Sequence, residues 1–399
     1  MTRRRLPVVA LVALVLAAPA GAGSPPLAKR LARALAVPHV ARGQTAAIAF
    51  DLQTGKTLFA EHDTLSLAPA SNEKLVITYA ALVGLGRTFR IETDVLGRGQ
   101  QSGSVWQGHL LLVGHGDPTL SSADLAQLAS QVRAAGITRV TGAVFGDETF
   151  FDARRTAPGW KPWFYVNESP PLSALTVDRG SYRGRISRNP ALSAALLFRD
   201  ALRRAGVTVG GAGIGDEHGN EVPLAAVDSA PLSEIVRYMD KRSDNFTAEL
   251  VLKQLGAIEN GVGTSPGGAA YARRLLAEAG VPLTGVRLVD GSGLSLLDRL
   301  TVRALEATLR AAWADPDVRP AFLAALPVAG INGTLSDRMR RPPARGNVIA
   351  KTGTTFGASA LSGYVKRRYA FSVLQNGNPV SSFWARRAQD RFAIALAAE

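Results

Sequence analysis

The sequence predicts an α/β fold of the α+β kind, with one antiparallel sheet flanked by helices and built from both ends of the chain. Strand–strand–helix patterns occur at both ends: at 45–61 with a helix from Ser71, and at 360–374 with a helix at 383–398. Between these parts, residues 94–223 are rich in Gly and Val and contain several Pro turns. This stretch predicts a smaller, mixed α/β domain inserted into the first.

The remaining elements follow from the spacing of apolar residues along the chain. Periodic apolar positions predict helices at 26–37, 71–82, 122–136, 192–206, 232–255, 269–280 and 301–313. Short apolar runs predict strands at 109–113 and 140–145 of the insertion. We therefore expect a discontinuous main domain at 24–93 plus 224–399 and an inserted domain at 94–223.

The N-terminus has the three-part layout of a secretory signal peptide at 1–23. Arg3, Arg4 and Arg5 precede an apolar run at 7–18, and small residues follow with Ala20 and Ala22 in an Ala-x-Ala pattern. The run has about a dozen residues, whereas a spanning helix needs roughly 20. We expect export to the periplasm or cell wall, with an uncleaved N-terminal anchor as the alternative.

Composition excludes several classes of chemistry. The chain has no Cys, which excludes disulfides and thiol nucleophiles, and its five His residues show no metal-binding spacing. We expect no metal and no cofactor. The net charge is +14, or about +11 without the three signal arginines. Because Lys and Arg are spread along an exported chain, the charge predicts peripheral association with anionic wall polymers or membrane rather than nucleic-acid binding.

Three short motifs carry the candidate chemistry. The first, Ser71-Asn72-Glu73-Lys74, stands at a predicted helix start. Residues i and i+3 share a helix face, so the Lys74 amine can reach the Ser71 hydroxyl. A desolvated amine can act as the base of a serine nucleophile, and the first turn offers N–H groups to an oxyanion. Taken alone, the motif also fits an ordinary capped helix start.

The second motif is Ser243-Asp244-Asn245, at the head of a loop into another helix. Its hydroxyl can relay a proton, and its amide can hold a substrate amide. Alone, it also fits a helix cap. The third is Lys351-Thr352-Gly353-Thr354, which enters the terminal hairpin. On an edge strand it can bind a carboxylate and let a peptide add alongside, because Gly353 has no side chain.

These three motifs, in this order, form the active-site set of penicillin-binding proteins and class A β-lactamases. Further stretches resemble the D-alanyl-D-alanine carboxypeptidase/endopeptidase type of penicillin-binding protein, peptidase family S13: residues 114–120, 157–160, 169–179, 290–295 and 326–330. The resemblance implies the serine β-lactamase/DD-peptidase (penicillin-recognising) fold, with its insertion between the first two motifs.

The sequence departs from the family pattern in two places. The family usually carries a nested third domain after the stretch matching 177–179, but here 180–190 leads almost directly to the next helix. The family also often has Gln shortly after its K-T-G, where this chain has Phe356. Asp147 and Arg338 match family positions that bind a diaminopimelate-type side chain. Each also fits a surface ion pair, and Phe356 puts that side-chain preference in question.

The resemblance implies a serine-type D-Ala-D-Ala carboxypeptidase, with endopeptidase activity left open, that acts on peptidoglycan stem peptides and is inhibited by β-lactams. We expect Ser71 to be acylated with Lys74 as base, and the N–H groups of Ser71 and Thr354 to hold the oxyanion. Further roles fall to Ser243 with Lys241 or Lys351 in proton transfer, Asn245 and Thr354 in orienting the peptide, and Lys351 with Thr352 in binding its carboxylate. The alternatives are a β-lactamase or esterase on the same fold, and a non-catalytic wall-binding protein.

Overall fold

The structure, a computed structural model, describes residues 25–216 and 219–399. Its five-stranded antiparallel sheet has the order β11-β12-β13-β1-β2, so strands from the two ends of the chain are neighbours. The strands are β1 (Thr45–Asp51), β2 (Lys56–Glu61), β11 (Val348–Thr354), β12 (Ala358–Val365) and β13 (Tyr369–Asn376). Helices flank this sheet, which confirms the predicted fold class.

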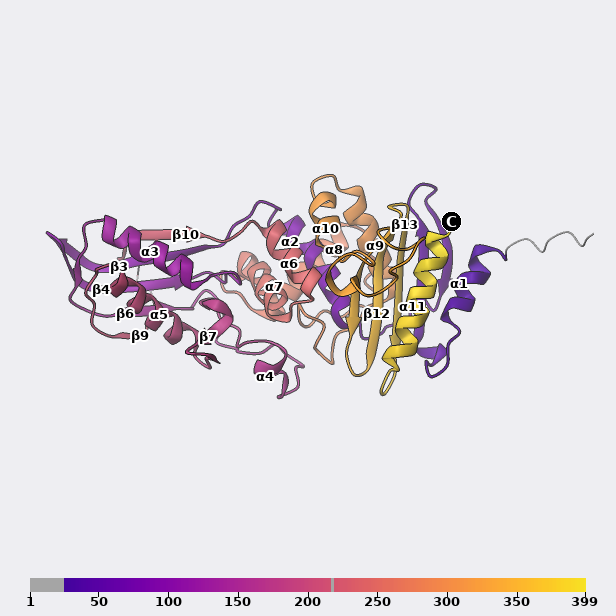
Figure 1. Ribbon diagram of the computed structural model, residues 1–399, viewed down its shortest axis with the longest axis horizontal. Helices are drawn as coiled ribbons and strands as arrows, with labels where there is room; N and C mark the ends of the chain where they lie inside the picture. The colour runs from indigo at the N-terminus through magenta and orange to yellow at the C-terminus, as the bar shows by residue number, and fades with distance from the viewer. Residues whose placement is uncertain (1–24, 217–218) are drawn as a thin grey trace, which may run out of the picture.

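Alternation along β1 explains how both faces of this sheet are covered. Ala47 and Ala49 face a core formed with α1 (Leu27–Leu35) and α11 (Ser382–Ala397). Ala46 and Ile48 face the larger core on the other side. That core contains residues of α2 (Glu73–Gly84), α6 (Leu232–Arg242), α7 (Asn245–Asn260), α8 (Ser265–Glu278), α9 (Val302–Ala314) and α10 (Arg319–Ala325). Figure 1 shows α1 and α11 on the outer face and the other helices on the inner one.

A second sheet, of mixed strand direction, has the order β10-β3-β4-β6-β9, with β5 also pairing with β4. Its strands are β3 (Glu92–Ser102), β4 (Val105–Gly114), β5 (Arg139–Val140), β6 (Val144–Asp147), β9 (Ala212–Ile214) and β10 (Val222–Asp228). Helices α3 (Ser122–Ala134) and α5 (Pro190–Arg204) share its core. The two sheets lie at opposite ends of the long axis, with α2, α6 and α7 between them (Figure 1). The predicted domain boundaries at 94 and 223 remain a prediction.

The segment between β6 and α5, residues 148–189, contains little regular secondary structure. It holds the four-residue α4 (Phe164–Asn167) and a hairpin of β7 (Ser181–Tyr182) and β8 (Arg185–Ile186). This hairpin follows residues 177–179, after which the family usually carries its nested domain. The absence of that domain from this chain remains a prediction. The predicted signal peptide at 1–23 lies outside the described residues.

The structure corrects several predicted boundaries. The helix predicted at 232–255 is two helices, because Ser243 has a left-handed backbone (φ 57°) and Asp244 then caps α7. The strand predicted at 140–145 is divided between β5 and β6. The helix expected from Ser71 begins as a 3₁₀ turn at Ala70–Asn72. Helix α10 was not predicted, since its seven residues are too few for a clear period.

Candidate active site

Ser71 lies in the 3₁₀ turn that precedes α2, and Lys74 lies in the first turn of α2. The Lys74 Nζ donates to Ser71 Oγ at 3.2 Å, to Asn245 Oδ1 at 2.9 Å and to the Ser292 carbonyl at 2.5 Å. Lys74 is fully buried, and burial lowers its pKa because it penalises the charged form. The neutral amine keeps two N–H bonds and gains a lone pair, so it can accept the Ser71 proton without losing its other two partners.

The loop that supplies the Ser292 carbonyl is held by buried carboxyl groups. Glu249 accepts the N–H groups of Gly291 at 2.7 Å and Ser292 at 3.0 Å. Burial, and next the charge of Asp290, raise the pKa of Glu249 to about 8. Burial likewise raises the pKa of Glu73. Near neutral pH the Glu249 carboxyl is therefore largely protonated, which limits the negative charge beside Lys74.

The second motif joins α6 to α7. Asp244 accepts the Thr247 N–H at 2.8 Å and so caps α7, which places Ser243 and Asn245 on either side of the cap. The amide of Asn245 accepts from Lys74 and donates to the Glu168 carbonyl at 3.1 Å. The middle motif therefore contacts both the first motif and the segment between β6 and α5.

The third motif lies on β11, the edge strand of the five-stranded sheet. The Lys351 Nζ donates to Ser243 Oγ at 2.8 Å, across 108 residues of sequence, and to the Thr352 carbonyl at 2.9 Å. Lys351 is fully buried, and burial together with the nearby charge of Lys74 lowers its pKa to about 7. Asp240, also fully buried, has its own pKa raised by burial to about 6.

The backbone of β11 is suited to bind an extended peptide. The Ala350 N–H points away from β12 and donates to the Pro327 carbonyl at 2.9 Å. Strand alternation directs the Thr354 N–H toward the same free edge. A Cβ at Gly353 would lie 3.0 Å from the Pro69 carbonyl and 3.1 Å from Ala70 Cβ. Gly353 therefore also lets β11 approach the segment just before Ser71.

Side chains of all three motifs open into one cavity of about 350 Å³. It is lined by Ser71, Ser243, Thr334, Asp337, Arg338, Thr352, Thr354 and Arg386. Lys241 is not among these residues; its Nζ donates to the Leu326 carbonyl at 2.8 Å and to Asn332 Oδ1 at 3.0 Å. Of the two lysines proposed to pass a proton through Ser243, Lys351 is the one with a direct contact.

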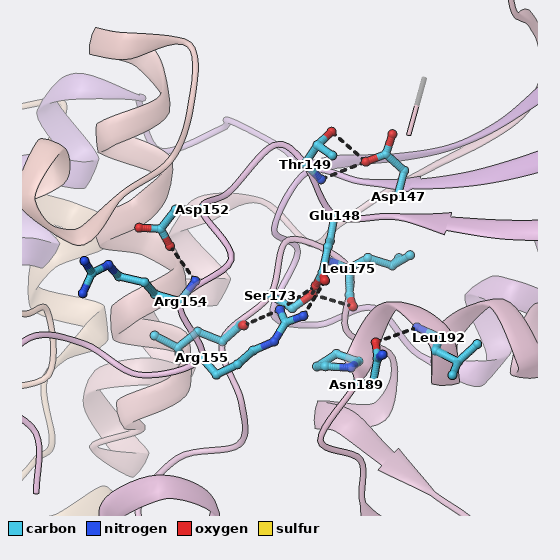
Figure 2. Close-up of polar contacts among 12 residues, drawn as sticks. Asp147, Glu148, Thr149, Asp152, Arg154, Arg155, Ser173, Leu175, Asn189 and Leu192 are labelled. Carbon is cyan, nitrogen blue, oxygen red and sulfur yellow. Dashed lines mark hydrogen bonds and ion pairs between the residues drawn. The ribbon is translucent and has the colours of Figure 1, made fainter. Parts of the chain in front are cut away.

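The two residues predicted to bind a diaminopimelate-type side chain of the substrate lie in different places. Arg338 lines the cavity, and its guanidinium donates to Asp390 at 2.7 Å and to Gln389 at 3.2 Å. Asp147 ends β6 and accepts the N–H and hydroxyl of Thr149 at 2.8 and 2.7 Å, while the neighbouring Glu148 points the other way, toward Arg155 and Ser173 (Figure 2). Asp147 is not among the residues that line the cavity, and its binding role remains a prediction.

Several residues of the site were not identified from the sequence. The Ser292 carbonyl had an indirect signal, because residues 290–295 match the family. Asp240 and Glu249 had none, because only the packing shows that they are buried beside the lysines. Arg386, on a helix that also carries Arg387 and Arg391, had no signal that distinguished it from its neighbours. Among residues 25–216 and 219–399, no cluster of three or more His, Asp or Glu side chains could hold a metal ion.

Comparison with known proteins gives a matching family and several related chains. The model of the D-Ala-D-Ala carboxypeptidase 3 (S13) family matches residues 27–189 and 183–398. The chain is 33% identical over 439 residues to a D-alanyl-D-alanine carboxypeptidase of Actinomadura sp., covering 88% of this chain and 80% of that one. It is 36% identical over 354 residues to a carboxypeptidase of Mycobacterium tuberculosis, covering 82% and 74%.

Solved structures show the same fold. Penicillin-binding protein 4 of Haemophilus influenzae superimposes with a TM-score of 0.80 at 21% identity, covering 92% of this chain and 98% of that one. The same protein complexed with a β-lactam gives a TM-score of 0.76 with the same identity and coverage.

Proposed function

Since the chain belongs to the D-Ala-D-Ala carboxypeptidase 3 (S13) family, we propose that it is a serine-type D-Ala-D-Ala carboxypeptidase acting on peptidoglycan stem peptides. One observation carries the proposal. Ser71 with Lys74, at 3.2 Å, and Ser243 with Lys351, at 2.8 Å, form two hydroxyl–amine pairs beside one cavity. Such pairs supply a nucleophile with its base and a relay to the leaving group.

The reaction is an acyl transfer through a covalent intermediate. Ser71 Oγ attacks the carbonyl carbon of the penultimate D-alanine while Lys74 takes its proton. The N–H groups of Ser71 and Thr354 stabilise the oxyanion. Collapse of the tetrahedral intermediate breaks the peptide bond, and the departing nitrogen receives a proton through Ser243, which Lys351 can resupply. Water then hydrolyses the acyl-enzyme and regenerates Ser71.

The other side chains hold the peptide. Asn245 and Thr354 orient its backbone, and Thr352 faces its carboxylate. Endopeptidase activity on cross-linked peptides is part of the proposal, because the β11 edge can pair with a longer chain. A diaminopimelate-type preference through Arg338 and Asp147 is a further proposal, which the position of Arg338 in the cavity supports.

We also propose that β-lactams acylate Ser71. These inhibitors present a reactive amide next to a carboxylate, as the D-Ala-D-Ala terminus does, and their ring fragment stays attached after attack. The Haemophilus relative has been solved with a β-lactam bound. The reaction takes place outside the cytoplasm in this proposal, where stem peptides lie, and it needs neither metal nor cofactor. Within the described residues, no helix is long and apolar enough to cross a membrane.

Intact-protein mass spectrometry after exposure to benzylpenicillin tests the proposal. We expect a persistent single adduct on the wild-type protein and none on Ser71→Ala, with release of D-alanine from a D-Ala-D-Ala peptide by the wild type alone. Rapid hydrolysis of the antibiotic without an adduct would instead identify a β-lactamase. No adduct and no hydrolysis would favour a wall-binding protein without catalytic activity.

A further inference from the structure

The cavity beside Ser71 contains a cation that the mechanism above does not use. Arg386, on α11, lines this cavity together with Ser71, Thr352 and Thr354. Its Nη2 lies 3.4 Å from Thr354 Oγ1. The Arg386 side chain is exposed, and among the described residues it forms no ion pair. It is therefore available to a ligand.

The other cations near the cavity are already engaged. Arg338 is paired with Asp390 at 2.7 Å. The amines of Lys74 and Lys351 are fully buried and donate to protein oxygens, which suits proton transfer rather than the binding of an anion. Arginine, in contrast, stays charged at all working pH values and matches a carboxylate with two parallel N–H bonds.

The hydroxyls beside Arg386 form an arrangement that accepts an anion. Thr352 and Thr354 are two residues apart on β11, so they share one face of the strand. The Thr352 hydroxyl contacts Thr334 Oγ1 at 2.7 Å, and Thr354 contacts Arg386. One acidic side chain, Asp337, also lines the cavity. It is exposed, so water and salt weaken its repulsion of a bound carboxylate.

We propose that Arg386 binds the carboxylate on the carbon that carries the leaving nitrogen, together with the hydroxyls of Thr352 and Thr354. This inference rests on the proposed function and adds to it the group that selects substrates with that carboxylate. The C-terminal D-alanine of a stem peptide has it, and so does a penicillin. Arg386 touches the substrate without taking part in bond making, so it determines specificity.

The test compares a ligand that has the carboxylate with one in which it is masked. The second-order rate constant for acylation of Ser71 is measured with benzylpenicillin and with its methyl ester, for the wild type, Arg386→Gln and Arg386→Lys. Arg387→Gln is the matched control, since Arg387 is adjacent and exposed but stacks on Trp384 at 5.5 Å instead of lining the cavity.

We expect Arg386→Gln to slow acylation by benzylpenicillin about 10- to 100-fold, as loss of a charge-assisted bidentate pair implies. For the same variant, the acylation rate constant with the methyl ester should change less than about threefold. With benzylpenicillin, the rate constant of Arg386→Lys should lie between those of the wild type and Arg386→Gln, and that of Arg387→Gln should equal the wild-type value. For a D-Ala-D-Ala peptide, KM should rise more than kcat falls.

Two results would overturn the inference: wild-type acylation by benzylpenicillin in Arg386→Gln, or equal losses with the acid and the ester. Either result leaves the proposed function standing, provided that the wild type is acylated. If the wild-type protein itself forms no adduct, the proposed function fails, and the inference fails with it.

Discussion

Arg179 forms a two-point ion pair with Asp244, the central residue of the second motif. Its Nη1 and Nη2 lie 3.1 and 2.7 Å from the two carboxylate oxygens, and its guanidinium also stacks on Phe246 at 5.2 Å. Arg179 belongs to the segment between β6 and α5, whereas Asp244 caps α7 between Ser243 and Asn245. The pair therefore ties this segment to the turn that carries Ser243 and to the Asn245 amide that contacts Lys74.

This pair predicts that Arg179→Ala lowers the rate of Ser71 acylation without changing the residues that react. We expect a loss of about tenfold, because a partly exposed two-point pair is worth on the order of 1–2 kcal/mol. Arg179→Lys should recover only part of the rate. The measurement is the benzylpenicillin acylation rate, with Arg183→Ala as control, since Arg183 stacks on Tyr182 in the nearby hairpin. Wild-type acylation in Arg179→Ala would contradict the prediction.

The two buried amines predict how acylation depends on pH. Burial lowers the pKa of Lys74 and brings that of Lys351 to about 7, so the pair loses a proton near neutrality. The rate constant for acylation should rise about tenfold per pH unit below this midpoint and level off above it. Stopped-flow measurements with a chromogenic β-lactam from pH 5 to 9 would show this. A flat profile would exclude a lysine base.

The buried position of Asp240 predicts that a substitution there shifts the pH profile of acylation. Its carboxylate is buried beside both lysines, and its negative charge raises the pKa of Lys351. Asp240→Asn removes this charge while the amide oxygen can still accept the Thr78 hydroxyl, which lies at 2.7 Å. The midpoint of the acylation profile should therefore move to lower pH, by about one unit. Asp337→Asn, on the exposed rim of the cavity, is the control and should leave the midpoint in place.

The burial of Glu249 predicts that the free energy of unfolding changes with pH. Burial raises the pKa of Glu249 in the folded protein to about 8, above its ordinary 4.5. The folded state therefore binds more protons than the unfolded state between these values. The stabilising contribution of the protonated group is complete below pH 4.5 and is lost as the pH rises through 8, at up to about 1.4 kcal/mol per unit.

Glu249→Gln removes this titration but retains an oxygen for the Gly291 and Ser292 N–H groups. The free energy of unfolding in urea should therefore fall less between pH 5.5 and 8.5 in the variant than in the wild type. Glu259→Gln, at a more exposed ion pair with Arg274, should keep the wild-type dependence. The prediction would be wrong if the Glu249→Gln and wild-type slopes coincided.

Gly353 predicts a local effect on Ser71. A methyl group at this position would press on the Pro69 carbonyl and Ala70 Cβ, so β11 and the Ser71 turn would have to move apart. We expect Gly353→Ala to lower the acylation rate by at least about tenfold, and to cost about 1–3 kcal/mol of stability if the strain is not relieved. Gly43→Ala is the control, because nothing lies within 4 Å of its Cβ position. Acylation rates and urea unfolding measure the two effects.

The hairpins and the longer helices could be predicted because their signals are local. Alternation in 45–50 and the helical period in 122–136 can both be read from residues close together in the chain. The backbone hydrogen bonds of the helix also form within its own segment, whereas β1 pairs with β2 and with the distant β13. The helix at 232–255 was predicted as one piece for the same reason: its apolar period continues across the break. Only the left-handed backbone at Ser243 divides it, and that conformation is stabilised by contacts with Lys351 and by the cap at Asp244.

By itself, the sequence predicted which groups react. The i, i+3 spacing brings Lys74 to Ser71 in any helical turn, and the order of the three motifs identifies the family. Tertiary structure decided what these groups can do. It alone joins Lys351 to Ser243, brings the Ser292 carbonyl to Lys74, and directs Arg386 of the last helix toward the cavity. The physical reason is that spacing along a helix follows from local backbone geometry, whereas burial, and the lowered pKa values that result from it, depend on packing among distant segments.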